Sequence, residues 1–150
     1  MKKRPTVLIL DDDELVIQSL GKALQNLGYG VILCLNPREA LDRIENSEVD
    51  LVVSDLRMPA MNGIEFLEKI QAKCPNAARV LMIGPEDREI AAAAISREAA
   101  DWFLGKPWEE EVIRLTLLMI LRLQRIVCEN RELQSRLREQ EAGQENAFIT

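Results

Sequence analysis

Three aspartates and one lysine stand directly after short apolar segments, where side chains of parallel strands would meet. Asp11 and Asp12 follow TVLIL, Asp55 follows LVVS, and Lys106 follows WFLG. Carboxylates crowded together repel each other, and they persist in water when a cation is bound among them. Mg²⁺ suits this role because it prefers oxygen ligands, and a lysine would add a positive charge for phosphoryl oxygens. The four residues therefore predict an aspartate that acts as a nucleophile toward phosphorus.

Each residue also has an ordinary structural explanation. Aspartates before a helix are common N-caps, and this is the preferred interpretation of Asp13 and Glu14. A single Asp at the end of a strand, such as Asp55, is by itself more often a turn residue. Lys106 before Pro107 would likewise be a solvated lysine. The prediction therefore depends on the combination of residues.

The elements that would position these residues follow from the hydrophobic pattern. Continuous apolar runs, typical of strands covered on both faces, occupy 6–10, 31–35, 51–54, 80–83 and 102–104. Helical spacing follows each run, at about 16–27, 37–46, 64–73, 87–100 and from 109 onward. Such alternation predicts the α/β class, with right-handed crossovers on a doubly wound parallel sheet. Function gathers at the carboxyl ends of such strands, where the acids and the lysine lie.

Composition excludes several other classes of protein. A net charge of −6 argues against a general nucleic-acid binder, and the absence of histidine excludes imidazole chemistry. Cys34, Cys74 and Cys128 form neither a CxxC pair nor an even set, which favours a reducing compartment. The apolar run after MKKRP is too short for a signal peptide or a membrane span. A cytoplasmic protein without direct nucleic-acid or membrane partners is therefore expected.

Taken together, these motifs resemble the receiver domain of bacterial response regulators over about residues 5–125. VLILDDDE resembles the first strand and acid pair of that family, and DLVVSDLRMPAMNG resembles its phosphoacceptor strand and loop. DWFLGKP resembles its fifth strand and lysine. The resemblance implies a flavodoxin-like sheet of five parallel strands in the order 2-1-3-4-5.

The resemblance also implies a role for each site residue. Asp55 would accept a phosphoryl group from a sensor histidine kinase or a phosphotransfer protein, with no enzyme activity beyond self-phosphorylation and self-dephosphorylation. Asp12 and Asp55 would bind Mg²⁺ directly with the main-chain carbonyl of Arg57, and Asp11 would act mainly through water. Lys106 would pair with the phosphoryl group.

At the end of the fourth predicted strand the sequence departs from the family. The family usually places Thr or Ser here, whose hydroxyl binds a phosphoryl oxygen; this chain has Gly84, followed by Pro85, which has no N–H. One charge-assisted hydrogen bond of this kind contributes roughly 1.5–3 kcal/mol. Phosphorylation without the usual switching is therefore one hypothesis. In another, Arg57 and Glu86 form an ion pair over Asp55 that hinders water and prolongs the life of the acyl phosphate.

Two further expectations concern the fifth predicted strand. Phe103 matches the aromatic switch residue of the family, although a half-buried strand aromatic explains it equally well. The Lys106–Pro107 bond would be cis, an isomer that an X–Pro bond adopts at modest cost.

After Pro107 the helical pattern continues beyond the length of a receiver. Residues 112–118 would pack on the sheet of their own domain, whereas later residues follow a heptad repeat in which a lone Asn at an a position favours a parallel dimer. The predicted seam comprises Met119, Leu123, Ile126, Asn130, Leu133 and Leu137. The pattern ends at Gln140 and Gly143. The expected organisation is a receiver at 1–122, a protruding helix at 123–142 and a disordered tail at 143–150.

Three functional hypotheses remain open from the sequence. The first is a receiver that relays its signal through the C-terminal helix to an output domain or partner. The second is a pseudo-receiver that dimerises and docks partners without phosphorylation, which Gly84 and Pro85 favour. The third is a phosphatase of the haloacid dehalogenase type, because Asp11-Asp12-Asp13 contains a DxD; this hypothesis leaves Asp55 unexplained.

Overall fold

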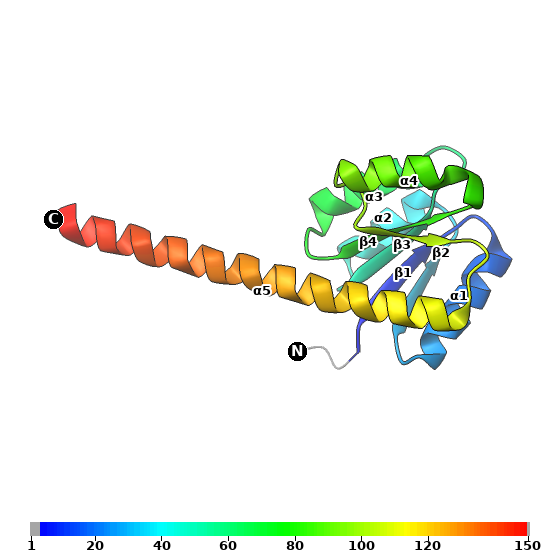
Figure 1. The fold of residues 1–150 in the computed structure, drawn as a ribbon, viewed down its shortest axis with the longest axis horizontal. Helices are drawn as coiled ribbons and strands as arrows, with labels where there is room; N and C mark the ends of the chain where they lie inside the picture. Colours follow the sequence, from blue (N-terminus) through cyan, green and yellow to red (C-terminus); the bar gives the residue numbers. More distant parts are fainter. Residues whose placement is uncertain (1–3, 150) are drawn as a thin grey trace.

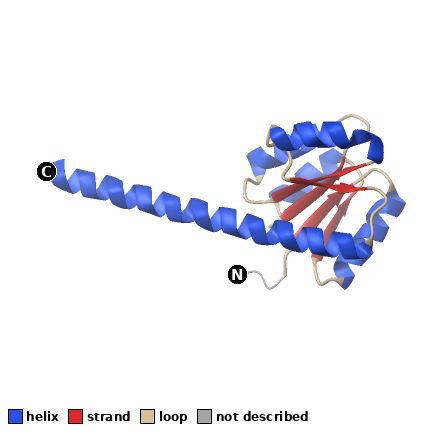
Figure 2. Cartoon of the chain, viewed as in Figure 1, coloured by secondary structure: helices blue, strands red, loops and turns tan. Residues whose placement is uncertain are grey.

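The computed structural model describes residues 4–149, with side chains described as far as residue 144. Strands and helices alternate along the chain, as Figures 1 and 2 show. The strands are β1 (Thr6–Leu10), β2 (Gly30–Cys34), β3 (Leu51–Asp55), β4 (Ala78–Ile83) and β5 (Trp102–Gly105). The helices are α1 (Glu14–Asn26), α2 (Pro37–Glu45), α3 (Gly63–Lys73), α4 (Arg88–Ser96) and α5 (Glu110–Ile149), and a 3₁₀ turn spans Pro85–Asp87.

The five strands form one parallel sheet in the order β2-β1-β3-β4-β5, which confirms the predicted topology. Helices cover both faces, which agrees with the mainly apolar sequences of the strands. On one face α1 and α5 pack on the sheet through residues such as Leu20 and Leu117. On the other face α2, α3 and α4 pack on it through residues such as Ile44, Phe66 and Ala91. Two hydrophobic layers therefore hold the sheet and fix the position of its edges.

Helices α1, α2 and α3 begin at residues whose side chains cap them. Asp13 accepts the amide N–H of Leu15 at 3.0 Å, which confirms its predicted role at the start of α1. Asn36 and Asn62 accept amide N–H groups in the first turns of α2 and α3. Gly28, at φ +95°, follows α1 in the left-handed conformation that glycine favours. Helix α4 ends at Ser96, earlier than the sequence pattern predicts.

Helix α5 passes under the sheet and then leaves the domain, as Figure 1 shows. Its 40 residues span about 60 Å at 1.5 Å per residue. It stays helical through residues 143–149, so the prediction of a disordered tail there is wrong; Thr150 lies outside the described residues. The prediction that residues 112–118 pack on their own sheet is confirmed: Ile113 and Leu117 are buried in the core on the sheet, and Val112 and Leu115 lie on the exposed face of the helix.

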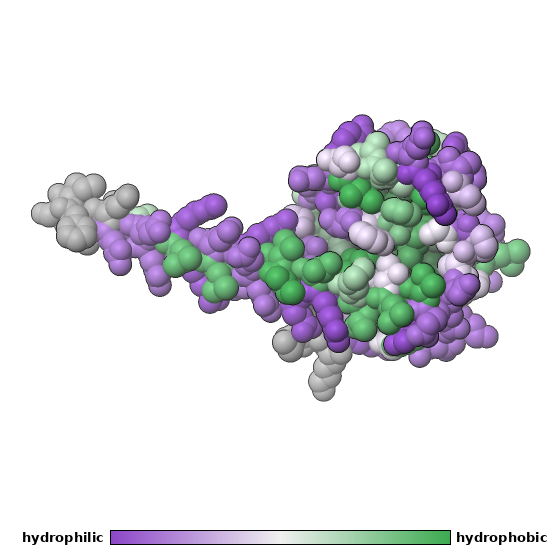
Figure 3. All heavy atoms as spheres, viewed as in Figure 1, coloured by the Kyte–Doolittle hydropathy of each residue, from purple (hydrophilic) through white to green (hydrophobic). Residues whose placement is uncertain are grey.

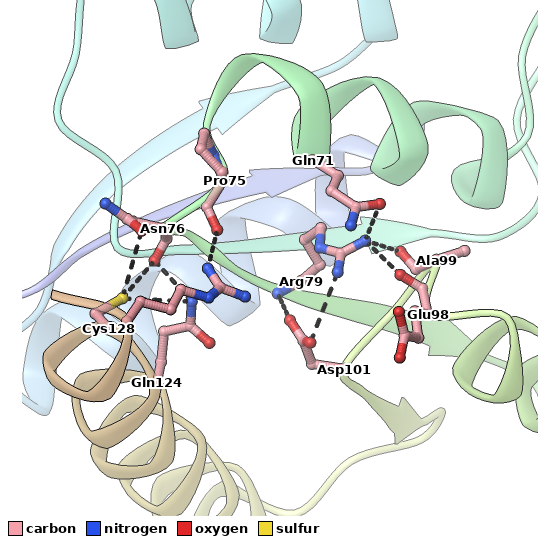
Figure 4. Close-up of polar contacts among 10 residues, drawn as sticks. Gln71, Pro75, Asn76, Arg79, Glu98, Ala99, Asp101, Gln124 and Cys128 are labelled. Atoms are coloured by element: carbon pink, nitrogen blue, oxygen red, sulfur yellow. Dashed lines mark hydrogen bonds and ion pairs between the residues drawn. The ribbon is translucent and has the colours of Figure 1, made fainter. Parts of the chain in front are cut away.

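Polar contacts hold α5 at the point where it leaves the domain, at the amino edge of the sheet (Figure 4). Gln124 donates to the carbonyl of Asn76 at 2.9 Å, and the thiol of Cys128 lies 3.6 Å from Oδ1 of the same residue. Arg131 donates to the carbonyl of Pro75 at 3.4 Å. We call these five residues the α5 clasp. The clasp fixes which side of α5 faces the domain.

Candidate functional site

Two strands deliver the three aspartates to the carboxyl edge of the sheet. Asp55 ends β3, and Asp11 and Asp12 follow β1, which pairs directly with β3. One carboxylate oxygen from each aspartate lies within 4.8 Å of the others. Asp11 and Asp55 are buried and Asp12 is exposed. The predicted cluster is therefore present, with one side open to solvent.

Lys106 lies among these acids. Its ammonium group donates to Oδ1 of Asp55 at 2.9 Å and to Oδ2 of Asp11 at 3.0 Å. The backbone N–H of Lys106 also binds the carbonyl of Ile83 at 2.7 Å, which continues the pairing of β4 and β5 up to the site. The Lys106–Pro107 peptide bond is cis, as the resemblance implies.

Burial and charge oppose each other at this edge. Burial raises the pKa of Asp11, although the Asp13 amide and the Lys106 ammonium partly offset the effect. Burial would lower the pKa of Lys106, but its hydrogen bonds and attraction to Asp55 and Asp11 outweigh burial, and the pKa is raised. A single ammonium thus faces three carboxylates, and an added cation would relieve the excess of negative charge.

The donor set fits a hard divalent cation. The cluster offers only oxygen atoms, without the histidine nitrogen or cysteine sulfur that transition metals favour. Asp12 and Asp55, with the carbonyl of Arg57 on the following loop, are the residues that would hold Mg²⁺. Bound there, the ion would neutralise charge on phosphoryl oxygens.

Gly63 allows the loop after Asp55 to close tightly against the site. A Cβ atom at this position would lie 2.2 Å from the backbone oxygen of Asp55, so no other residue fits without a shift. The amide of Gly63 donates to the carbonyl of Leu56 at 2.8 Å. Ala60, in the same loop, takes a φ of 70°. This close approach explains why the sequence has glycine eight residues after the aspartate.

At the end of β4 the structure shows what occupies the place of a hydroxyl side chain. A Cβ atom on Gly84 would lie 2.8 Å from Oε1 of Glu86, so the Glu86 carboxylate folds over this glycine. Arg57 does not pair with Glu86; it makes a two-bond contact with Asp87 instead. The hypothesis of an Arg57–Glu86 ion pair is therefore wrong. Sequence reasoning missed Asp87 because an acid at the start of a helix resembles an ordinary cap.

Phe103 is half-buried on β5 and packs against the core between the sheet and helices α2 to α4. Its ring stacks on that of Trp102, with centroids 6.2 Å apart. The position agrees with both interpretations of Phe103, as a switch aromatic and as a strand aromatic.

The predicted dimer seam lies along the exposed surface of α5. Its apolar members, from Met119 to Leu137, are between 45% and 61% exposed, and Asn130 is exposed as well. Figure 3 shows hydrophobic side chains on α5 both over the domain and on the projecting part. The seam lies roughly opposite the α5 clasp at 100° per residue. It is far along the chain from the acids and takes no part in the acid cluster.

Comparison with known proteins agrees with this geometry. The model of the response regulator receiver domain matches residues 7–118. The chain belongs to this family. Receiver domains are phosphoacceptors that histidine kinases phosphorylate, and their acidic pocket binds Mg²⁺. Within the described part of the chain, no helix has the length and apolar character to cross a membrane.

Among curated relatives, a cyclic di-GMP phosphodiesterase of Thermotoga maritima is 36% identical over 117 residues, which are 78% of this receiver chain and 31% of that protein. The transcriptional regulatory protein FixJ of Bradyrhizobium diazoefficiens is 34% identical over 79% of this chain and 57% of its own length. The chain thus spans between about a third and somewhat over half of these two relatives. The phosphodiesterase name reflects a part of that protein outside the matched region.

Among solved structures, the signal receiver domain of an HD domain-containing protein from Pseudomonas fluorescens Pf-5 superimposes with a TM-score of 0.78. It is 31% identical, and the match covers 86% of this chain and 95% of that one. An uncharacterized protein from Neptuniibacter caesariensis gives a TM-score of 0.79 at 34% identity, covering 84% and 93%. Both matches extend over nearly the whole of the solved chains.

Proposed function

We propose that Asp55 of this receiver accepts a phosphoryl group from a sensor histidine kinase or phosphotransfer protein. The observation that carries the proposal is the contact of the Lys106 ammonium with both Asp55 and Asp11. This contact leaves one oxygen of Asp55 for attack and places a cation where phosphoryl oxygens would arrive. Asp12 lines a groove of about 570 Å³ beside Met58 and Pro37, which gives a partner access to the site.

The transfer needs little from the protein besides positioning and charge. A carboxylate oxygen of Asp55 attacks phosphorus, the P–N bond to the partner's histidine breaks, and the departing imidazole nitrogen takes a proton from solvent. The product is an acyl phosphate. Lys106 pairs with the phosphoryl oxygens, and Asp12, Asp55 and the Arg57 carbonyl would hold Mg²⁺, which would neutralise part of their charge. Later attack by water on phosphorus returns the free carboxylate and inorganic phosphate.

Incubation with Mg²⁺ and acetyl phosphate tests this proposal. We expect a mass gain of one phosphoryl group that is lost in Asp55→Ala and in EDTA. Glu68→Ala, which removes an exposed acid on α3 outside the groove that Asp12 lines, is the control and should retain the gain. Absence of any modification would favour the pseudo-receiver. Repeated turnover of phosphate esters would favour the phosphatase.

We further propose that the signal passes to an output domain or partner through a parallel dimer of α5, with the receiver ending near residue 122. Two features support this: the seam residues are exposed, and Gln124 and Cys128 bind the domain from the other side of the helix. Asn130 at an a position would hold the two helices in register.

Sedimentation analysis of paired variants tests the dimer. Leu133→Lys places a charge in the seam and should lower the fraction of dimer at least tenfold. Ser135→Lys adds the same charge at an exposed position off the seam and should leave the dimer intact. Equal behaviour of the two variants, or a monomeric wild-type chain, would contradict the seam. The comparison is made with and without acetyl phosphate to show whether phosphorylation changes the dimer.

A further inference from the structure

Arg57 and Asp87 join the two loops that border the phosphoacceptor. The guanidinium donates to Oδ2 of Asp87 at 3.1 Å and to Oδ1 at 2.5 Å, a two-bond arrangement that fixes both groups. Arg57 stands two residues after Asp55 in the loop between β3 and α3. Asp87 is the last residue of the turn that leads from β4 into α4. The contact therefore ties the start of α4 to the loop that carries the proposed metal ligand.

The two partners differ sharply in exposure. The side chain of Asp87 is only 3% exposed, whereas that of Arg57 is 67% exposed. A carboxylate buried to this degree is stable only while it is paired. An exposed arginine side chain, in contrast, can swing to another anion without losing its solvation. Separation of the pair therefore affects the two partners differently. Arg57 can leave, but Asp87 cannot stay buried without a partner.

A competing anion would appear within the same electrostatic neighbourhood. The pKa of Arg57 is raised first by its hydrogen bond to Asp87, and the charges of Glu86 and Asp55 contribute in the same direction. The side chain therefore already interacts with Asp55 at a distance. A phosphoryl group on that residue would add between one and two negative charges and three acceptor oxygens.

The turn that Asp87 ends has few other ties to the site. Its backbone amide binds the carbonyl of Gly84 at 3.1 Å, and its side chain makes no cap for α4. Gly84 has no hydroxyl to draw the turn inward, and Pro85 has no N–H to donate. Among the described contacts, the bridge from Arg57 is the one side-chain link between this turn and the loop after Asp55.

We propose that Arg57 is the switch residue of this receiver: its guanidinium leaves Asp87 for the phosphoryl oxygens on Asp55, and the turn Pro85–Asp87 then opens. The Asp87 carboxylate, left without its partner, moves into water and carries the start of α4 with it. Arg57 in this way takes the place of the hydroxyl that Gly84 lacks. This inference rests on the proposed phosphorylation of Asp55.

Two measurements on the full chain test the switch, with beryllofluoride and Mg²⁺ as the phosphoryl mimic. In the wild-type protein we expect the NMR signal of the Arg57 side-chain Nε–H to shift when beryllofluoride is added. We also expect amide hydrogen exchange over residues 86–91 to become roughly tenfold faster. An unchanged Arg57 signal, or unchanged exchange in this segment, would overturn the switch.

Paired variants separate the bridge from the general charge of the turn. Asp87→Asn removes the carboxylate charge that holds Arg57, so exchange over 86–91 should already be fast without beryllofluoride and should change little on its addition. Glu86→Gln, the matched control one residue away, should behave like the wild type. If the two variants behave alike, the bridge does not control the turn. The wild-type measurements stand by themselves if Asp87→Asn does not fold.

Mass spectrometry of the wild-type protein with acetyl phosphate distinguishes the two levels of the proposal. A phosphoryl gain together with an unmoved Arg57 overturns the switch and leaves the proposed function standing. No phosphoryl gain overturns the proposed function, and the switch with it. A gain together with the expected Arg57 shift and faster exchange supports both.

Discussion

The two edges of the sheet handle buried charge in opposite ways. At the carboxyl edge, one ammonium from Lys106 faces the three acids Asp11, Asp12 and Asp55. At the amino edge, one guanidinium from Arg79 is surrounded by acceptors (Figure 4). The first edge has more negative charge than its own residues neutralise. The second has its charge and polar groups matched.

The contacts of Arg79 show how complete the matching is. Its guanidinium donates to the carbonyls of Glu98 and Ala99 at 2.8 and 2.7 Å, reaches Gln71 at 3.4 Å, and lies 3.7 Å from the Asp101 carboxylate. Its backbone amide donates to the same carboxylate at 2.7 Å. These bonds join α3, β4 and the turn before β5. The contacts of Arg79 therefore stabilise the amino edge, whereas the carboxyl edge keeps an excess of negative charge.

The largest expected effect is at the amino edge. Arg79→Met keeps the apolar stem but leaves the two carbonyls and Asp101 without their donor, so the free energy of unfolding should fall by about 3 kcal/mol. Arg97→Met, at an exposed position directly after the end of α4, is the control. It should change the free energy of unfolding by less than about 0.5 kcal/mol. Urea unfolding followed by circular dichroism measures both. Similar losses in the two variants would remove the proposed distinction between the edges.

The next effect sharpens the description of the carboxyl edge. Mg²⁺ at a hundred times its dissociation constant should raise the free energy of unfolding by about 2.7 kcal/mol, because it binds the folded chain only. Asp12→Asn should lose most of this gain. Asp13→Asn, whose side chain keeps its capping oxygen on α1, should retain it. Thermal unfolding with Mg²⁺ and with EDTA provides the measurement, and equal gains in both variants would contradict the assigned metal ligands.

The smallest effect is a pH dependence without metal. Because the pKa of Asp11 is raised by burial, the folded chain binds more protons than the unfolded chain above the ordinary carboxyl pKa. The free energy of unfolding in EDTA should therefore fall as the pH rises from about 4 through the raised pKa. Asp11→Asn should flatten this part of the profile. The opposite result, a free energy of unfolding that rises with pH over this range in the wild type but not in Asp11→Asn, would show that pairing with Lys106 outweighs the effect of burial on Asp11.

Much of the acid site could be predicted because its residues end or directly follow strands, and parallel strands end at the same edge of the sheet. Continuous apolar runs are typical of parallel strands covered on both faces, and residues that follow parallel strands meet at one edge of the sheet. The sequence alone therefore predicts that Asp11, Asp12, Asp55 and Lys106 lie together. Gly63 ends the motif DLVVSDLRMPAMNG, but the reason for a glycine there, a backbone approach to Asp55, requires the folded loop.

The partner of Arg57 was not predictable in the same way. Glu86 and Asp87 are adjacent acids about thirty residues after Arg57, and the sequence alone allows either of them to pair with it. The 3₁₀ turn rotates Asp87 inward, where it is buried, and leaves Glu86 exposed over Gly84. The rotation of the chain between these two adjacent residues decides which acid binds Arg57. Hydrophobic periodicity in the sequence does not predict such a rotation.

The sequence by itself determined the α/β class with a parallel sheet, the acid cluster and the periodicity of α5, since each depends on the spacing of residue types along the chain. Tertiary structure alone decided three things: that Arg57 binds Asp87, that Arg79 closes the amino edge, and that Gln124, Cys128 and Arg131 hold α5 with its seam outward. These depend on contacts between segments far apart in sequence. Their geometry exists only after the sheet has brought the segments together.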